Sequence, residues 1–345
     1  MVAAVGASAG SSGIDAKPKP KPKAAAKAKC TTPTNIDFRL NWVVDYENGL
    51  YFNAIDKGWY KGACLNVNIQ AGTGSTSAVQ LVASGAAPMG VADVISVVAG
   101  QAQGLPVTAV GVLMQRNPSA FVIREDSLTQ AEKNGKSLDL SVLTGKTYGQ
   151  TVGSALAILW QSLTKTRGFD PDKVKTVTVT PPGFAELASG KVDFLANWEF
   201  IKPVLETNLK VKVRVLRFED LQPLGYGLVY IVNNDWLKSH EKAVSAFLEV
   251  TKRSMIATAA DPAGSVDRLC AHEASNCSTE QAKQVTIAQY TGVAATYKST
   301  DKKRPYLCIN AAKWAQTQSA LADGGVPSNG PGPGKAFTNK YLKGC

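Results

Sequence analysis

Histidine is scarce in this sequence, and its cysteines are never closely spaced as a pair. Only His240 and His272 occur in 345 residues, and the six cysteines include no Cys-x-x-Cys pair. These absences argue against a zinc site, which takes most of its ligands from these two residue types. A Ser-His-Asp catalytic triad is also disfavoured, since neither histidine falls near the end of an expected strand. We therefore expect no metal, no cofactor and no catalytic residue, and we predict that the protein is not an enzyme.

Long hydrophobic runs and clusters of basic residues are missing as well. No apolar stretch approaches the length that spans a bilayer, so we expect a soluble mature chain. Of the net charge of +11, six lysines and one aspartate in the first 30 residues account for +5, which leaves +6 for the rest. Without a basic helix or an arginine cluster, this mild excess does not predict binding to nucleic acid.

The stretch "GTGSTSA" at residues 72–78 lacks what a nucleotide loop requires. A phosphate-binding loop of the Walker type needs a lysine after its last glycine, and a dinucleotide fingerprint needs glycine where Ser77 stands. What is left is a turn made by Gly72 and Gly74 and a helix that begins with Ser75 or Thr76 as its cap. The N–H groups of such a helix start favour a carboxylate, a sulfonate or a polarised heteroatom. An ordinary capped turn is the alternative.

The first 34 residues differ in composition from the rest of the chain. "VAAVGASAGSSG" resembles the end of a secretory signal, and "AKPKPKPKAAAKAKC" is a lysine–proline repeat typical of a stiff, disordered spacer. We therefore predict an exported protein that works outside the cytoplasm, in the periplasm or at the cell surface. An even number of scattered cysteines then favours disulfides, with Cys270–Cys277 as the easiest local pair.

From residue 36 onward, short extended segments alternate with helical ones, and a second series of this kind starts at "GKTYGQTVGS". This alternation predicts an α/β fold with two lobes, each built on a mixed, mostly parallel sheet, joined by two hinge strands. We place the hinge strands near Phe121–Arg124 and Leu228–Val232. The expected domains are a spacer at 1–34, a first lobe at 35–122 plus 231–345, and a second lobe at 123–230.

Polar and aromatic residues stand at the ends of several expected strands, where parallel sheets place their ligand sites. Aromatic faces among them suit a flat ring. Each has a structural alternative, which is the core for an aromatic residue and a turn or helix start for Asp93, Gln115 or Glu199. Ser154 is also expected to cap the helix that follows it. The candidate ligand-binding residues are Trp42, Gly74, Ser75, Thr76, Asp93, Gln115, Ser154, Trp198, Glu199 and Tyr226.

Several segments resemble the NMT1/THI5-like solute-binding proteins of ABC importers. They include "LNWVVDYENGLYFNAIDKGWYKGACLNVNI", "GFDPDKVKTVTV" and "ELASGKVDFLANWE", and the resemblance runs from Asp37 to Leu269. It implies a type II periplasmic-binding-protein fold that closes on a small molecule. It further implies a monomer that delivers its ligand to an ABC permease and its ATPase.

The resemblance does not fix the ligand. An acidic residue at Glu199 would accept a hydrogen bond from a ring amine, as in relatives that bind thiamine-pyrimidine precursors, so a small heteroaromatic is our first expectation. Riboflavin, or an anion such as an alkanesulfonate, taurine or nitrate, is the alternative. A third reading is the eukaryotic branch that makes the thiamine pyrimidine. Its cysteine-rich, iron-associated motif and essential histidine are not visible in this sequence.

Overall fold

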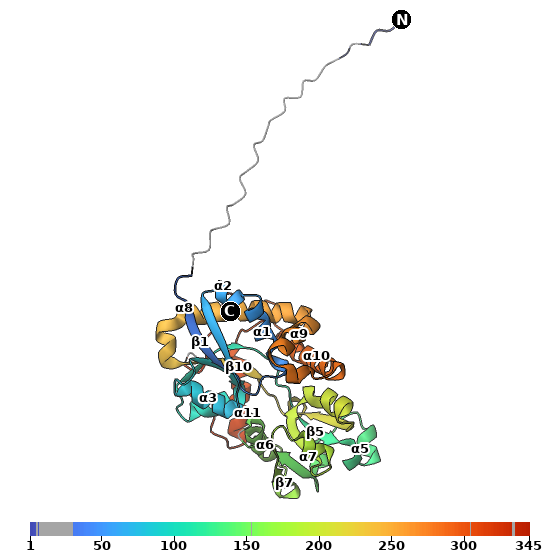
Figure 1. Cartoon of the computed structure of the whole chain (residues 1–345). Helices are drawn as coiled ribbons and strands as arrows, with labels where there is room; N and C mark the ends of the chain where they lie inside the picture. The colour runs from blue at the N-terminus through green and yellow to red at the C-terminus, as the bar shows by residue number, and fades with distance from the viewer. Residues whose placement is uncertain (5, 7–29, 153, 304, 333–334) are drawn as a thin grey trace. The chain divides into compact units, whose positions relative to one another are not determined.

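The computed structural model describes residues 1–4, 6, 30–152, 154–303, 305–332 and 335–345. Most of the expected signal remnant and spacer lies outside these residues. The chain divides into two compact units, Met1–Thr31 and Thr32–Cys345, and the second holds the elements discussed below (Figure 1).

The first sheet is mixed, with strand order β2-β1-β3-β10-β4. β1 pairs in parallel with β2 and β3, whereas β10 runs antiparallel to both β3 and β4. All residues of β3, β4 and β10 are buried, as expected for strands covered on both faces. The strands are β1 (Thr34–Arg39), β2 (Leu65–Gln70), β3 (Met89–Asp93), β4 (Val107–Val112) and β10 (Leu228–Asn233).

The second sheet repeats this arrangement with strand order β7-β6-β8-β5-β9. β6 pairs in parallel with β7 and β8, and β5 runs antiparallel to β8 and β9. Its strands are β5 (Ser119–Arg124), β6 (Thr147–Gln150), β7 (Lys175–Thr178), β8 (Phe194–Trp198) and β9 (Val213–Arg217). Two mixed sheets with one antiparallel strand each confirm the predicted fold class.

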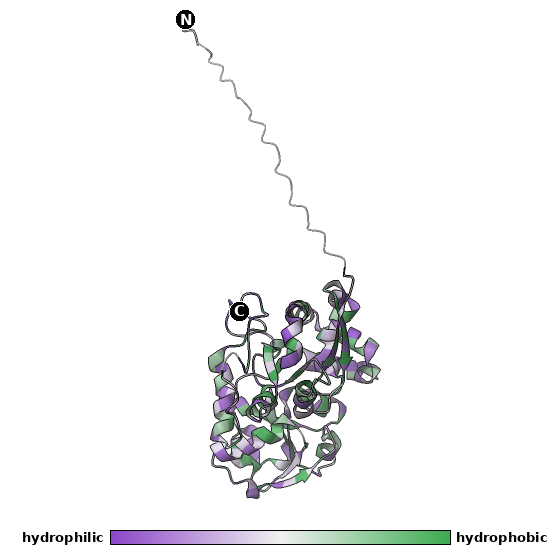
Figure 2. Cartoon of the chain, turned by 90° about the vertical axis from the view of Figure 1, so that its left-hand side faces the viewer, coloured by the Kyte–Doolittle hydropathy of each residue, from purple (hydrophilic) through white to green (hydrophobic). Residues whose placement is uncertain are grey.

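Helices cover both faces of the first sheet, and side chains of β10 alternate between the two layers. Val229 and Ile231 pack with residues of α3 and α4, whereas Tyr230 and Val232 pack with those of α1 and α8. Figure 2 shows hydrophobic residues along the strands and on one side of the helices. The helices are α1 (Gly49–Asp56), α2 (Trp59–Gly62), α3 (Ser75–Ala83), α4 (Val94–Ala102), α5 (Gln130–Asn134), α6 (Ala155–Thr166), α7 (Phe184–Ala188), α8 (Asn234–Ala260), α9 (Pro262–His272), α10 (Glu280–Ala295) and α11 (Ala311–Asp323).

The chain passes between the sheets at 113–118 and 218–227, just before the residues expected to form hinge strands. Those residues instead lie inside β5 and β10, each within one sheet. The two connecting segments are hydrogen-bonded side by side: the backbone N–H of Gly227 donates to the carbonyl of Met114 (3.0 Å), and the side-chain amide of Asn117 donates to the carbonyl of Tyr226 (2.8 Å). The lobe boundaries proposed from the sequence stay a prediction.

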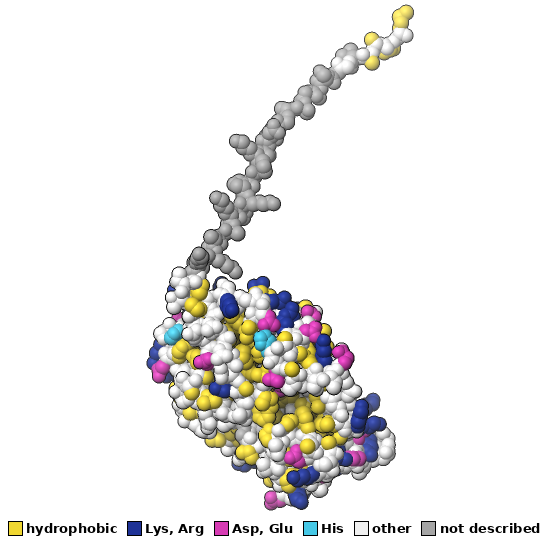
Figure 3. All heavy atoms as spheres, in the orientation of Figure 1, with side chains coloured by type: hydrophobic (Ala, Val, Ile, Leu, Met, Phe, Trp, Pro, Cys, Tyr) yellow, Lys and Arg dark blue, Asp and Glu magenta, His cyan; other side chains and the backbone are white. Residues whose placement is uncertain are grey.

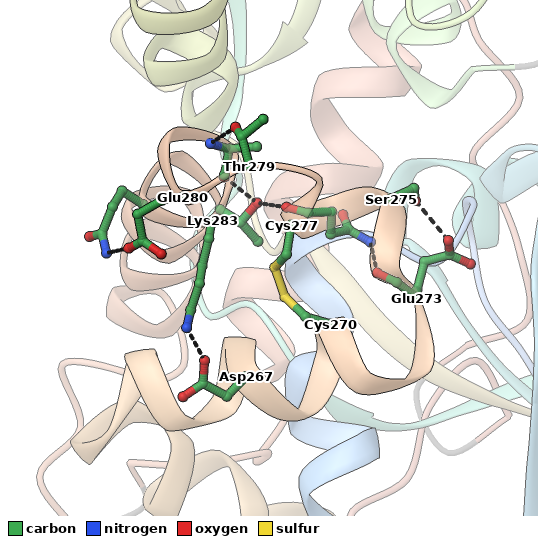
Figure 4. The surroundings of a disulfide bond; sticks show 12 residues. Asp267, Cys270, Glu273, Ser275, Cys277, Thr279, Glu280 and Lys283 are labelled. Carbon is green, nitrogen blue, oxygen red and sulfur yellow. Dashed lines mark hydrogen bonds and ion pairs between the residues drawn. A yellow bond between two sulfur atoms is a disulfide. The ribbon is translucent and has the colours of Figure 1, made fainter.

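Disulfides stabilise the C-terminal part of the chain. Cys270 and Cys277 are joined with their Cα atoms 5.7 Å apart, which confirms the predicted pair (Figure 4). Beside this pair, Lys283 forms an ion pair with Asp267 (2.5 Å). A second disulfide joins Cys308 to Cys345. Among the described residues, no helix has both the length and the apolar character required to cross a membrane.

Candidate functional site

A cavity of about 510 Å³ lies where strand ends of the two sheets approach each other. In Figure 3, hydrophobic side chains gather on the face between the positions that α10 and α7 occupy in Figure 1. The described residues that line the cavity are Asn41, Trp42, Val43, Asp45, Tyr46, Glu47, Gly72, Thr73, Gly74, Ser75, Asp93, Thr151, Ser154, Ala155, Leu156, Pro181, Pro182, Phe184, Ala196, Asn197, Trp198, Ile201, Val204 and Gln289.

The loop that follows β1 supplies the first wall of the cavity. Asp45 caps the short 3-10 helix Tyr46–Asn48, accepting a hydrogen bond from the backbone N–H of Glu47 (3.2 Å), and the side chain of Asn48 accepts one from the backbone of Asp45 (2.9 Å). This capping box satisfies two backbone donors and fixes the turn. In this loop, the aromatic side chains of Trp42 and Tyr46 line the cavity, and Glu47 is buried.

The glycine-rich loop lies directly against this segment. The backbone N–H of Gly72 donates to the carbonyl of Trp42, and that of Gly74 to the carbonyl of Asn41, both at 2.8 Å. A Cβ on Gly72 would lie 2.1 Å from the carbonyl oxygen of Leu40, so only glycine fits there.

The N-cap of α3 differs from the prediction that Ser75 or Thr76 would cap the helix. Gly74 is the N-cap, with φ of 139°, and no side chain caps the helix. The hydroxyl of Ser75 instead accepts a hydrogen bond from the backbone N–H of Asp93 (3.0 Å) and so joins α3 to the end of β3. Asp93 in turn caps α4 by accepting from the backbone N–H of Ile95 (3.0 Å).

The second sheet supplies the opposite wall. Ser154 caps α6 by accepting a hydrogen bond from the backbone N–H of Leu156 (3.2 Å), as predicted. Trp198 ends β8 and lines the cavity with Phe184 at the start of α7. Val43, in the lining, is 51% exposed.

Four predicted site residues lie outside the lining. Thr76 faces Ser96, with 3.4 Å between the hydroxyl oxygens. Glu199 follows Trp198 by one residue, but it begins the 3-10 helix Glu199–Ile201 and pairs with Arg116. Gln115 and Tyr226 lie in the two connecting segments, where both are buried against the C-terminal part of the chain.

The lining is rich in buried carboxyl groups, and the sequence reasoning missed two of them. Glu47 is 2% exposed, and burial together with the charge of Asp45 raises the pKa of its carboxyl well above the usual range. Burial also raises the pKa of Asp45 and of Asp93 to about 7, although hydrogen bonds from backbone N–H groups oppose the shift. The polar run "DYEN" directly after a strand end was the available signal for Asp45 and Glu47.

The described lining contains no lysine, arginine or histidine. His240 stacks on Trp236 with their ring centroids 4.2 Å apart, and His272 pairs with Asp56 at 2.8 Å. Within the described ranges, no group of three or more His, Cys, Asp or Glu side chains is placed to hold a metal ion. The residues described here therefore do not fit the cysteine-rich, iron-associated site of the eukaryotic branch.

Comparison with known proteins adds a family. Residues 47–265 match the family described as NMT1/THI5 like, which confirms the resemblance seen in the sequence. A relative from Uromyces fabae is 30% identical over 68% of this chain and 70% of its own length, and is named 4-amino-5-hydroxymethyl-2-methylpyrimidine phosphate synthase. A relative from Saccharomyces cerevisiae, the synthase THI13, is 29% identical over 66% of this chain and 68% of its own.

Solved structures of similar fold include binding proteins. The ligand-binding component of an ABC-type import system from Staphylococcus aureus aligns with a TM-score of 0.65 at 15% identity, over 90% of this chain and 99% of that one. The periplasmic aliphatic sulphonate binding protein SsuA from Escherichia coli aligns with a TM-score of 0.61 at 16% identity, over 84% of this chain and 86% of that one. At such identity, the likeness concerns the fold.

These names correct one prediction. The sequence led us to expect that the protein is not an enzyme, and the curated relatives at 29–30% identity are named as synthases. The expectation rested on the scarcity of histidine and on the dispersed cysteines, and the names of these relatives overturn it.

Proposed function

The chain belongs to the NMT1/THI5-like family, and we propose that it binds a small heteroaromatic compound in the cavity between its two sheets. One observation carries the proposal: Trp42, in the loop after β1 of the first sheet, and Trp198, at the end of β8 in the second sheet, line the same cavity. Aromatic side chains on facing walls suit a flat ring, which they contact through stacked or tilted faces. A cavity of about 510 Å³ is in the range of small-molecule sites.

The compound of first choice is a pyrimidine of the kind named in the relatives. Among the residues we propose as ligand contacts are six of the sequence candidates, namely Trp42, Gly74, Ser75, Asp93, Ser154 and Trp198. We consider an alkanesulfonate, taurine or nitrate a less suitable ligand, because no positively charged side chain occurs in the described lining. Riboflavin, a larger heteroaromatic without charge, stays within the proposed class.

The role that we propose for this binding is solute capture outside the cytoplasm and delivery to an ABC permease with its ATPase. Support comes from the fold, which is that of the binding components named above. In this role the two lobes close when the ligand binds the closed state more tightly than the open one. The connecting segments 113–118 and 218–227 are where such a motion would bend the chain.

A second candidate is the activity in the relatives' names, formation of 4-amino-5-hydroxymethyl-2-methylpyrimidine phosphate. It is favoured by sequence identity over two thirds of the chain. Both candidates require the same cavity to accept a pyrimidine, so ligand binding is the property to test first.

Thermal-shift measurements on the purified protein test the proposal, because a compound that binds only the folded state raises the melting temperature. We expect 4-amino-5-hydroxymethyl-2-methylpyrimidine or riboflavin to raise it and ethanesulfonate and taurine to leave it unchanged. Stabilisation by the sulfonates alone would overturn the proposal. Chromatographic detection of the pyrimidine phosphate after incubation of the protein with cell extract, against an extract-only control, would favour the synthase role.

A further inference from the structure

Two residues of the cavity lining carry buried oxygen atoms that lack a partner. In the part of the chain that the structure describes, Oε2 of Glu47 and Oδ1 of Asn41 are both buried and accept no hydrogen bond. Both residues line the cavity and are more than nine-tenths buried. A buried acceptor without a donor costs free energy, and a ligand that brings a donor recovers it.

Two further carboxyl groups, those of Asp45 and Asp93, lie close enough to Glu47 for their charges to disfavour its ionisation. All three groups line the cavity, whose described wall has no cationic side chain to balance them. A ligand that donates hydrogen bonds, or that carries positive charge, would compensate this cluster. A ligand with a phosphate or sulfonate group would add like charge to it.

We propose that Glu47, with Asn41 beside it, recognises an amino group on the heteroaromatic ring and that the cavity selects amine-bearing compounds without an acidic group. The inference rests on the proposed function and sharpens it, because it names the recognised group and the residue that accepts it. Trp42 and Trp198 then hold the ring, and Glu47 sets which edge of the ring faces its carboxyl group. Glu199, whose carboxylate pairs with Arg116, is not needed for this recognition.

The first turn of α3 acts in the opposite direction. Its N–H groups lie at the cavity without a side-chain cap and favour negative charge. The proposal therefore ranks two opposing effects on the affinity for a negatively charged ligand. The three carboxyl groups have the larger effect and the helix terminus the smaller, so a phosphorylated pyrimidine binds more weakly than the same pyrimidine without phosphate.

Calorimetric titration of the full chain with three probes tests the proposal. The probes are 4-amino-5-hydroxymethyl-2-methylpyrimidine, its phosphate ester, and 5-hydroxymethyl-2-methylpyrimidine, which lacks the amino group. We expect removal of the amino group to weaken binding about tenfold or more, because the buried oxygen atoms of Glu47 and Asn41 then lose the donor that the ligand supplies. We expect the phosphate ester to bind more weakly as well. Equal affinity with and without the amino group, or tighter binding of the ester, would overturn the inference.

The variant Glu47→Leu identifies the residue. It should weaken binding of the amino probe about tenfold or more and change binding of the probe without the amino group by less than about threefold. Glu241→Leu, at an exposed carboxylate that pairs with Lys340, is the matched control and should alter neither affinity. An equal loss for both probes in Glu47→Leu would remove Glu47 from amine recognition. If Glu47→Leu does not fold, the three probes on the unmodified chain still decide.

Failure of the proposed function looks different. In that case neither the three probes nor riboflavin binds the unmodified chain. This result overturns both the proposed function and the inference that rests on it. If the pyrimidines bind with equal affinity whether or not they carry the amino group, the proposed function stands and only the inference about Glu47 is overturned.

Discussion

The hydroxyl oxygen of Tyr226 accepts a hydrogen bond from the backbone N–H of Asn310, with 2.7 Å between the two atoms. Tyr226 lies in one of the two segments that connect the sheets, and Asn310 caps α11 near the C-terminus. Lys313, in the first turn of the same helix, lies over the Tyr226 ring at 5.1 Å and donates a hydrogen bond to the carbonyl of Gln115 in the other connecting segment. The C-terminal part of the chain thus contacts both connections.

This contact predicts the effect of Tyr226→Phe. The variant keeps the ring but loses the hydroxyl, so the backbone N–H of Asn310 loses its acceptor. We expect the free energy of unfolding to fall by about 1–2 kcal/mol in a urea titration. Affinity for the pyrimidine probe should stay within about twofold, because Tyr226 does not line the cavity. A large loss of affinity at unchanged stability would return Tyr226 to the ligand site.

Asp93→Asn should stabilise the unliganded protein in a manner that depends on pH. The pKa of Asp93 is raised by burial from 3.8 to about 7. The folded state therefore binds its proton more tightly than the unfolded state, and wild-type stability falls as pH rises from about 4 to about 7. Asparagine keeps an oxygen for the N–H of Ile95 and does not ionise. The stability advantage of the variant should grow by about 3 kcal/mol between pH 5 and pH 8. A pH-independent difference in urea unfolding would contradict the raised pKa.

Trp198→Ala should weaken binding of the pyrimidine probe about tenfold or more, since a large aromatic contact and its buried area are lost. Calorimetric titration measures the affinity, and circular dichroism checks that the variant is folded. Trp236→Ala is the matched control, because Trp236 stacks on His240 away from the cavity lining. Unchanged affinity in folded Trp198→Ala would remove Trp198 from the site.

Gly72→Ala should destabilise the protein by roughly 3 kcal/mol or more, because the added methyl group overlaps backbone atoms of the neighbouring segment. Its Cβ would lie 2.1 Å from the carbonyl oxygen of Leu40, and this backbone atom cannot move without disturbing the cavity wall. At Gly62 in α2, a Cβ meets no atom within 4 Å, so Gly62→Ala should be neutral or slightly stabilising. Thermal unfolding of Gly72→Ala and Gly62→Ala checks this prediction. Melting temperatures equal to that of the wild type for both variants would contradict it.

The disulfides Cys308–Cys345 and Cys270–Cys277 should contribute unequally to stability. Cys308 and Cys345 are 37 residues apart and Cys270 and Cys277 are 7 apart, so the first bridge closes the longer loop. Loop-closure entropy then gives about 4 kcal/mol for the first and about 2.5 kcal/mol for the second. Paired serine substitutions, Cys308→Ser with Cys345→Ser and Cys270→Ser with Cys277→Ser, should rank in this order in urea unfolding. The reverse ranking would show that native contacts, rather than loop length, dominate.

Much of the fold could be predicted because it depends on local periodicity. Alternating extended and helical segments indicated two α/β series, and the structure has two sheets of matching strand order. The position of the hinge was less predictable. The residues proposed for it are apolar and extended, and nothing in their pattern separates a strand inside a sheet from a strand between sheets.

The site was predicted in part, and the reasons differ by residue. Trp42, Ser75, Asp93 and Ser154 follow or end strands at the edge where the sheets meet, and the rule that ligands bind there was sufficient to place them at the cavity. Gln115 follows β4 and Tyr226 precedes β10, and the C-terminal segment covers both of them. That contact joins residues about 80 to 190 positions apart, and no local pattern indicates it.

The sequence by itself determined the family, the order of strands and helices, and the residues from which a site could be built, because these follow from short-range periodicity and motif spacing. Only the tertiary structure decided which of them face the cavity. Trp198 lines it whereas Glu199, one residue later, pairs with Arg116. Glu47, in a run that reads as a polar loop, is buried in the lining of the cavity. The chain turns into a 3-10 helix directly after Trp198, which changes the direction of the next side chain, and burial depends on what the rest of the chain brings against a residue.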